Sequence, residues 1–183
     1  VSVSISPIKD AKGKIIGISK IAHDITKLSI LNHLASHDPL TGLPSYRTVL
    51  DRLEMACHQA DRYKKMIALM FIDIDDFKTI NDYHGHLIGN QVLKTFSDRL
   101  LKSIRNVDSV GRIGGDEFIV ILTELNNHDE IKKISFKMLK NINIPININQ
   151  LNIQLTISIG IAIYPKDANN IEDLKLIASL QNA

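Results

Sequence analysis

The apolar run from Met66 to Ile74 is the feature that most limits the folds open to this chain. It is nearly unbroken, and it is closed by the carboxylates of Asp73, Asp75 and Asp76. A strand that is covered on both faces of a sheet has this pattern, whereas a strand with one wet face alternates. The run therefore predicts the central strand of a sheet, with acidic side chains at its exit.

The segments around this strand follow an order typical of an α+β fold. Apolar residues at fourfold spacing predict a helix over 86–104, and Gly114-Gly115 predicts a tight hairpin between strands at about 108–113 and 117–123. Further helices are expected at about 45–60, over residues 131–142 and from about 171, while strict alternation predicts one strand over 151–163. Strand, helix, hairpin, helix, strand is the order of a split βαβ, ferredoxin-like sheet flanked by helices.

This topology has a consequence for two distant aspartates. The two strands joined by a helix are parallel, and in a split βαβ unit the second hairpin strand lies between them, antiparallel to both. The exit of strand 66–74 then lies beside the start of strand 117–123. Asp73 and Asp116 are therefore expected at the same end of the sheet, although 43 positions separate them.

The first 37 residues have a pattern of their own. Residues 1–22 alternate apolar and small polar side chains around a turn at 10–14, which predicts a β-hairpin. Large apolar residues then recur every third position, at Ile25, Leu28, Leu31 and Leu34. This spacing predicts a short amphipathic helix over 25–37. Residues 8–17 and the following 24–26 resemble the end of a PAS sensor domain. We therefore expect 1–24 to be the C-terminal fragment of such a domain, 25–37 a signalling linker helix and 38–183 the main domain.

Composition excludes several classes of function. The 183 residues carry 22 Lys and Arg against 20 Asp and Glu, a net charge of +2, so no nucleic-acid partner is expected. Cys57 is the one cysteine, which fits a reducing, cytoplasmic compartment. No apolar run approaches the ~20 residues that span a bilayer, so membrane contact is expected only through regions outside this chain. A start without Met and a stop inside an apolar helical pattern are typical of a segment of a larger protein.

The acidic end of the sheet suits a divalent cation. Paired carboxylates and nearby carbonyls are ligands for Mg²⁺, which completes its shell with phosphate oxygens and water. A calcium-binding EF-hand loop is excluded because Lys78 and His84 stand where it needs glycine and glutamate. No Walker A motif occurs, but the turn at 75–78 offers backbone N–H groups and the Lys78 cation to phosphates. The alternative is a solvated strand end followed by an ordinary hairpin turn.

Several motifs in order resemble those of the GGDEF domain, the diguanylate cyclase family. The string that carries the family name is Arg112-Ile113-Gly114-Gly115-Asp116-Glu117-Phe118. An opening motif at 38–44, a metal and phosphate strand at 71–82, and the segments 85–89 and 158–162 also match. The resemblance covers roughly residues 36–183.

The resemblance implies a polymerase-palm-like fold and a homodimer in which each subunit binds one GTP. Each 3′-hydroxyl attacks the α-phosphate of the other nucleotide, giving cyclic di-GMP and two pyrophosphates. The implied Mg²⁺ ligands, for which Mn²⁺ is a possible substitute, are Asp73, the carbonyl of Ile74, Asp116 and Glu117. The implied catalytic residues are Asp116, Glu117 and Lys78. The implied substrate-binding residues are Phe77, Lys78, Asn81, Asn90, Gly114 and Gly115.

A second site is implied by Arg105-Asn106-Val107-Asp108, just before the signature. It resembles the family's R-x-x-D motif, where the product cyclic di-GMP binds and inhibits. Arginine can grip guanine or phosphate in a bidentate way, and aspartate can accept from guanine N–H groups. The alternative is ordinary charge decoration at the end of a helix.

Two departures from the family pattern bear on function. Asn90 stands where the family has an aspartate that contacts guanine, and an amide has one acceptor oxygen where a carboxylate has two. The chain also ends before the family's basic Ala-Lys-x-x-Gly-Arg-like stretch. A rival hypothesis is therefore a weak or inactive module that binds GTP or cyclic di-GMP and regulates an attached phosphodiesterase. A different palm-type nucleotide cyclase or polymerase is a third.

Overall fold

A computed structural model describes residues 2–9, 11, 13–23 and 36–180. The chain divides into two compact units, residues 1–36 and 37–183. Among the described helices, none combines the length and the apolar character needed to cross a membrane.

The N-terminal unit contains the hairpin that the alternation predicts. Strands β1 (Ser2–Lys9) and β2 (Ile15–His23) are antiparallel, and Gly13 takes a positive φ of 81° in the turn. Ile5 and Ile18 remain largely exposed on this two-stranded sheet. The helix predicted over 25–37 falls mainly on 24–35, outside the described residues, and the PAS assignment stays a prediction.

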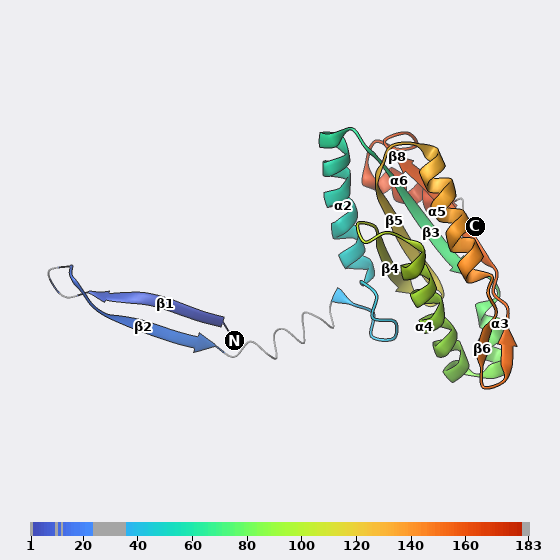
Figure 1. The fold of residues 1–183 in the computed structure, drawn as a ribbon, viewed down its shortest axis with the longest axis horizontal. Helices are drawn as coiled ribbons and strands as arrows, with labels where there is room; N and C mark the ends of the chain where they lie inside the picture. Colours follow the sequence, from blue (N-terminus) through green and yellow to red (C-terminus); the bar gives the residue numbers. More distant parts are fainter. Residues whose placement is uncertain (1, 10, 12, 24–35, 181–183) are drawn as a thin grey trace. The chain divides into compact units, whose positions relative to one another are not determined.

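The second unit is built on a four-stranded antiparallel sheet of order β4-β5-β3-β8 (Figure 1). The strands are β3 (Met66–Ile74), β4 (Ser109–Gly114), β5 (Glu117–Leu125) and β8 (Ile157–Tyr164). Strand β5 lies between β3 and β4 and is antiparallel to both. The α+β class and the position of the inserted strand are thus confirmed.

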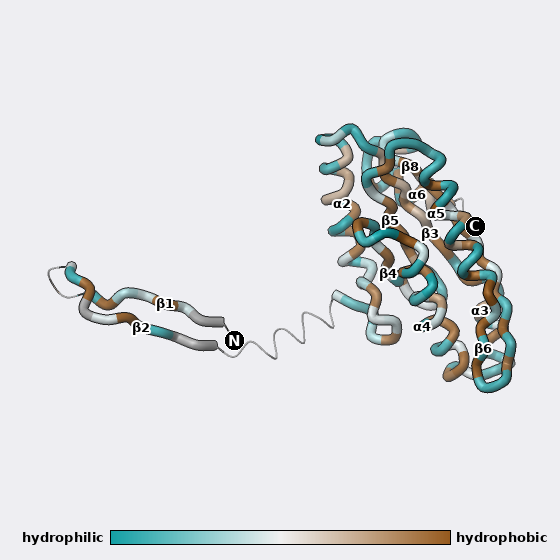
Figure 2. Tube along the Cα trace, viewed as in Figure 1, coloured by the Kyte–Doolittle hydropathy of each residue, from teal (hydrophilic) through white to brown (hydrophobic). Residues whose placement is uncertain are grey.

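Helices cover both faces of this sheet, which explains the unbroken apolar run of β3. Helices α4 (His86–Ser103) and α5 (His128–Ile142) pack on one face, and α2 (Tyr46–Tyr63) and α6 (Ile171–Leu180) on the other (Figure 1). The strands beneath them are mostly hydrophobic, while much of each helix is hydrophilic (Figure 2). Phe96 of α4 meets Phe118 of β5 edge to face at 4.9 Å between ring centroids. Asn127 caps α5 by accepting hydrogen bonds from two N–H groups of its first turn.

A close contact fixes α2 to the edge strand β4. A Cβ added at Gly111 would stand 2.1 Å from Cγ2 of Val49 and 2.8 Å from the carbonyl oxygen of Pro44. Only glycine leaves room for this approach. Helix α2 therefore starts directly beside the strand that leads into the Gly114-Gly115 turn.

The prediction of one strand over 151–163 is wrong. Strand β7 (Leu151–Ile153) pairs with β6 (Ile146–Ile148) in a separate hairpin, and β8 begins only at Ile157. Alternation reports which side chains share a face, and it continues through a break in pairing. The turn of the new hairpin uses Asn149 and Gln150, which have positive φ values of 48° and 69°. The turn predicted at 75–78 leads into a short helix that was not predicted, α3 (Phe77–His84), which ends at Gly85 with φ of 80°.

Candidate active site

Asp73 lies at the exit of β3, between the neighbouring strands. Its register partners are Glu117 of β5 and Ser158 of β8. Side chains directly opposite on antiparallel strands share a face, with Cβ atoms about 5 Å apart. The sheet therefore brings Asp73 and Glu117 to the same place, and Asp116 precedes Glu117 by one residue in the β4–β5 turn.

The carboxyl group of Asp73 is in an unfavourable environment. Its Oδ1 atom is buried and has no hydrogen-bond partner. Burial raises the pKa of Asp73, and the nearby negative charges of Asp116, Glu117 and Asp75 raise it further. The four carboxylates thus form one electrostatic cluster, and its members repel one another.

This cluster suits a divalent cation whose other ligands are substrate phosphates and water. Within the described residues, no three Asp, Glu, His or Cys side chains form a complete metal-binding set. Mg²⁺ is usually held by one or two carboxylates together with substrate phosphates and water, so a complete set is not required. The unpartnered oxygen of Asp73 is a donor of the right chemistry, and the backbone carbonyl of Ile74 is adjacent in sequence.

The turn that carries Asp116 is held by Arg112. Its Nε and Nη2 atoms donate to the carbonyl oxygen of Gly115 at 3.0 and 2.6 Å, and its Nη1 atom donates to both carboxylate oxygens of Asp38 at 3.0 and 3.1 Å. Both charged side chains are well shielded, with exposed fractions of 11% for Arg112 and 19% for Asp38. We call this arrangement the Arg112 clamp.

Asp38 in turn folds the segment before α2. Its Oδ1 atom accepts hydrogen bonds from the N–H and the hydroxyl of Thr41, at 2.8 and 2.6 Å, and its own N–H donates to Leu43. Burial alone would raise the pKa of Asp38, but these hydrogen bonds and the Arg112 charge outweigh it and lower the pKa. Asp38 is therefore a structural carboxylate, in contrast to Asp73.

The loop after β3 leads into α3 through two further aspartates. The N–H of Asp75 donates to the carbonyl of Thr156, and its Oδ1 accepts from the hydroxyl of Ser158 at 2.8 Å, which ties the loop to β8. Asp76 takes a left-handed conformation, with φ of 54°, at the N-cap of α3. The first N–H groups of a helix lack partners within it. Phe77 is buried beneath this turn, and Lys78 is exposed on it.

The two asparagines expected to read a base lie on adjoining helices. A Cβ added at Gly89 would stand only 2.0 Å from Oδ1 of Asn81 and 3.3 Å from Cζ of Phe77. Gly89 therefore lets α3 and α4 approach so closely that the Asn81 side chain rests on α4. Asn90 follows directly and is exposed.

Arg105 and Asp108 form a compact network instead of two free side chains. Asp108 accepts from the N–H, Nε and Nη2 of Arg105 and from the N–H of Thr123, at 2.9 to 3.1 Å. The Asp108 side chain has no exposed surface, whereas the Arg105 side chain is 40% exposed. Arg105 is the member of the pair that a ligand can reach.

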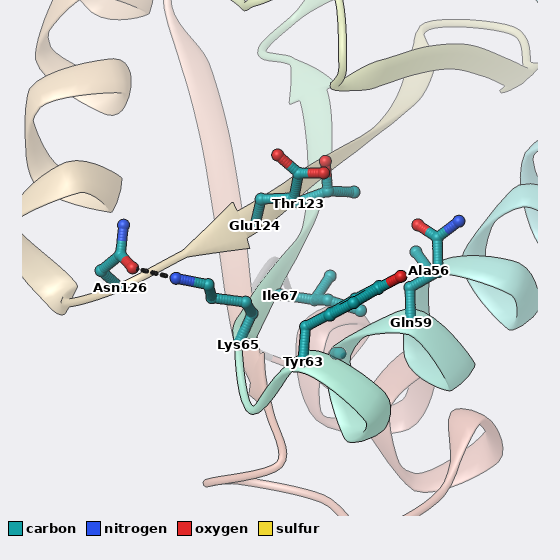
Figure 3. A pocket seen from close by; sticks show the side chains of 9 residues that line it. Ala56, Gln59, Tyr63, Lys65, Ile67, Thr123, Glu124 and Asn126 are labelled. Atoms are coloured by element: carbon teal, nitrogen blue, oxygen red, sulfur yellow. Dashed lines mark hydrogen bonds between the residues drawn. The ribbon is translucent and has the colours of Figure 1, made fainter.

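A separate pocket lies at the opposite ends of β3 and β5. It has a volume of about 660 Å³ and is lined by residues that include Gln59, Tyr63, Lys65, Glu124 and Asn126 (Figure 3). Lys65 donates to Asn126 at its rim. The carboxylate cluster is about six residues, or roughly 20 Å, further along the strands, so this pocket is not part of the candidate active site.

The comparisons with known proteins identify the family. Residues 35–180 match the family described as "Diguanylate cyclase, GGDEF domain". The chain belongs to the GGDEF domain family.

Curated relatives with different activities resemble the chain. It is 38% identical to the bifunctional diguanylate cyclase/cyclic di-GMP phosphodiesterase MucR of Pseudomonas aeruginosa, over 81% of the chain and 22% of MucR. It is 36% identical to the diguanylate cyclase TpbB of the same species, over 76% of the chain and 32% of TpbB. The chain therefore spans only about a fifth to a third of the length of these relatives.

Solved structures share the fold. The GGDEF domain of TpbB aligns with a TM-score of 0.77 and 34% identity, over 79% of this chain and 85% of that one. A sensory box/GGDEF family protein from Caulobacter crescentus aligns with a TM-score of 0.76 and 28% identity, over 80% of this chain and 95% of that one.

The roles of Asp38, Arg112 and Gly89 were not predicted from the sequence. Asp38 and Arg112 stood in recognised motifs, but 74 positions separate them, and no periodicity links them. The role of Gly89 depends on the distance between two helices. The only sequence signal was the presence of an acid, a base and a glycine inside motifs that otherwise carry chemistry.

We expect the Arg112 clamp to stabilise the fold in a pH-dependent way. Asp38→Asn should lower the free energy of unfolding at pH 7 by about 2 kcal/mol, because hydrogen bonds to charged groups are lost. The folded-state pKa of Asp38 is below its ordinary value of 3.8, so the stabilisation is complete above that pH and is lost as the pH falls through the lowered pKa. Urea unfolding of the wild type and of Asp38→Asn from pH 7 to pH 3 should show that the gap between their free energies of unfolding becomes smaller.

The control is Asp51→Asn, an exposed aspartate on α2, which should leave stability unchanged. A gap that stays constant over the whole pH range would contradict the assigned role of the Asp38 charge.

Proposed function

We propose that this chain is the catalytic domain of a diguanylate cyclase, which condenses two GTP molecules into cyclic di-GMP with release of two pyrophosphates. The observation that carries the proposal is the convergence of Asp73, Asp116 and Glu117 at one strand end, with a buried Asp73 oxygen left unpartnered. A repelling acidic cluster has little structural use, and it suits a cation that arrives with a triphosphate.

The proposed metal ligands are Asp73, the carbonyl of Ile74 and Asp116. They would hold Mg²⁺, or Mn²⁺ in its place, and the bound ion would supply Lewis-acid stabilisation of phosphate charge. Glu117 is exposed beside them, so it can complete the ligand set or accept the proton of the attacking 3′-hydroxyl.

The remaining residues would bind and orient the nucleotide. Lys78 and the N–H groups at the start of α3, above the buried Phe77, suit the β- and γ-phosphates. Gly114 and Gly115 are exposed, and a Cβ at either would meet nothing within 4 Å, so the turn leaves space for a substrate. Asn81 and Asn90 would contact the guanine.

The proposed reaction needs two copies of the domain. The reaction forms two bonds. In each bond-forming step, the 3′-oxygen of one GTP attacks the α-phosphorus of the other GTP, and pyrophosphate leaves. One site binds one GTP, so the two sites must face each other in a homodimer. The exposure of Glu117, Lys78 and Asn90 is compatible with this arrangement.

Incubation of the full chain with GTP and Mg²⁺ should produce cyclic di-GMP, detectable by chromatography and mass spectrometry. Asp116→Ala should reduce the rate by about a hundredfold or more, because an electrostatic contact made to the transition state is lost. Asp51→Ala, which removes an exposed carboxylate from α2, should retain the full rate. Undiminished product formation by Asp116→Ala would refute the proposed site.

The rival proposal is a regulatory module that binds nucleotide without turnover. MucR carries both activities in its name, and NbdA of Pseudomonas aeruginosa, 36% identical over 82% of this chain and 19% of its own length, is named as a phosphodiesterase. The amide at Asn90 favours this rival, because it offers fewer hydrogen-bond acceptors to guanine than the family's aspartate does. GTP binding by the wild-type chain with no cyclic di-GMP formed would select it.

Asn90 should relax base selectivity. A carboxylate accepts from both N1–H and the amino group of guanine, whereas an amide presents one acceptor. We expect ATP to compete measurably with GTP, and Asn90→Asp to raise the preference for GTP about tenfold, the effect of one improved hydrogen bond to a charged group. The control is Gln91→Glu, the same change of charge on the neighbouring exposed residue. A wild-type chain that ATP does not inhibit would contradict this expectation.

Product inhibition is proposed at Arg105, with Asp108 fixing the guanidinium. The exposed part of Arg105 can bind a phosphate or a guanine edge. We expect added cyclic di-GMP to slow GTP turnover, and Arg105→Ala to raise the half-inhibitory concentration about tenfold or more. Arg62→Ala, which removes an exposed arginine near the end of α2, should behave as wild type. Equal inhibition of both variants would exclude this site.

A further inference from the structure

Helices α4 and α5 lie side by side on one face of the sheet, so their outward sides form a single surface (Figure 1). Their inward sides supply much of the core. Exposed lysines and large apolar side chains of the outward side, together with one residue just after α5, define what we call the α4–α5 surface: Lys94, Leu101, Lys102, Lys133, Phe136, Lys137, Lys140 and Ile144.

This surface is strongly one-sided in charge. The sequence has no Asp or Glu from Ile131 to Lys166. The acids of the first turn of α5 are occupied, since Asp129 pairs with Lys132 at 3.4 Å and Glu130 accepts from Asn126 at 3.1 Å. Helix α4 adds one exposed acid, Asp98, on its outward side. It stands against the five lysines of the α4–α5 surface.

Three large apolar side chains project among these lysines. Exposed fractions are 72% for Phe136, 55% for Ile144 and 48% for Leu101. On α5, positions 133, 136, 137 and 140 lie on one side, opposite the buried Ile131, Met138 and Ile142, and Ile144 follows shortly after the helix ends. A shallow apolar recess of about 200 Å³ flanks Phe136 and adds to the exposed apolar area.

Arg99, which lies between the two helices, does not share this role. Its guanidinium donates to the carbonyls of Ile142, Ile144 and Pro145 and so closes the end of α5. The cations left to the surface are thus all lysines, which are point charges on long flexible stems.

We propose that the α4–α5 surface docks on an anionic lipid bilayer. Lysines around projecting aromatic and aliphatic side chains are the pattern of interfacial helices, in which the apolar groups enter the headgroup region and the cations meet anionic lipids. Lysine stems can reach along such an interface while the charge stays in water. This contact belongs to the chain itself, in contrast to the expectation that membrane contact lies only outside it.

A bilayer fits better than an acidic protein or a nucleic acid. Arginine predominates where planar carboxylates or phosphates are gripped in fixed geometry, and none is free on this surface. Phe136 and Ile144 are each more than half exposed, so they can enter the headgroup region of a bilayer. Docking by this helix layer leaves the carboxylate cluster, at the strand ends, outside the contact.

The test is co-sedimentation of the full 183-residue chain with vesicles. We expect binding to vesicles that contain about one third phosphatidylserine in phosphatidylcholine, no binding to pure phosphatidylcholine, and loss of binding in 0.5 M salt because exposed charges are then screened. The triple variant Lys133→Gln, Lys137→Gln, Lys140→Gln should bind about a hundredfold more weakly, since each lysine near an anionic surface contributes about a factor of five.

The matched control neutralises three cations on α2, at the opposite face of the sheet: Arg47→Gln, Arg52→Gln, Arg62→Gln. It should bind as wild type, and Phe136→Ser should weaken binding with all lysines present. GTP turnover without vesicles should be equal in all these variants, and circular dichroism should show that they are folded. Equal loss in both triple variants, or binding to soluble heparin with none to vesicles, would overturn the proposal.

Discussion

The candidate site depends on a repulsion between carboxylates, which the strand pairing of the sheet brings together. Strand β3 is buried on both faces, and its register with β5 sets Asp73 opposite Glu117 with Asp116 next to it. Burial and like charge both raise the pKa of Asp73, so the apolar core must stabilise the protein enough to tolerate this end of the sheet. In the proposed function, a bound cation would relieve this repulsion. The sheet would then position the carboxylates before the ligand binds.

The environment of Asp38 is the opposite of that of Asp73, and it explains how the carboxylate cluster keeps its shape. The same chemical group has a lowered pKa at Asp38, because hydrogen bonds from Thr41 and Arg112 outweigh its burial. It has a raised pKa at Asp73, because burial and the neighbouring carboxylates outweigh the one backbone hydrogen bond from Ile74. Arg112 connects the two environments, since it binds Asp38 with one edge and the Gly115 carbonyl with the other. The turn that carries Asp116 is thus fixed by a satisfied ion pair, while Asp116 and Glu117 stay close enough to Asp73 to raise its pKa.

The parts of this arrangement that follow from local pattern could be predicted from the sequence. The apolar run identified β3 as central, and a helical crossover with an inserted antiparallel strand then required Asp73 and Asp116 to lie at the same end of the sheet. Pairing over long distances could not be predicted. The alternation over 151–163 continues through the break between β7 and β8 because alternation records faces and not partners. The Arg112 clamp and the contact of Gly89 with Asn81 depend on distances that only the folded chain defines.

Close packing also connects the core to the proposed base recognition. Gly89 holds α3 against α4, so Asn81 and Asn90 belong to one rigid corner and not to two separate loops. A rigid corner cannot adjust to a missing acceptor, because close-packed interiors transmit strain and leave little slack. The amide at position 90 should therefore act directly on base selectivity. The outward sides of α4 and α5 are free of this constraint, since their inward sides alone fix the fold, and this freedom leaves that surface open to a second role.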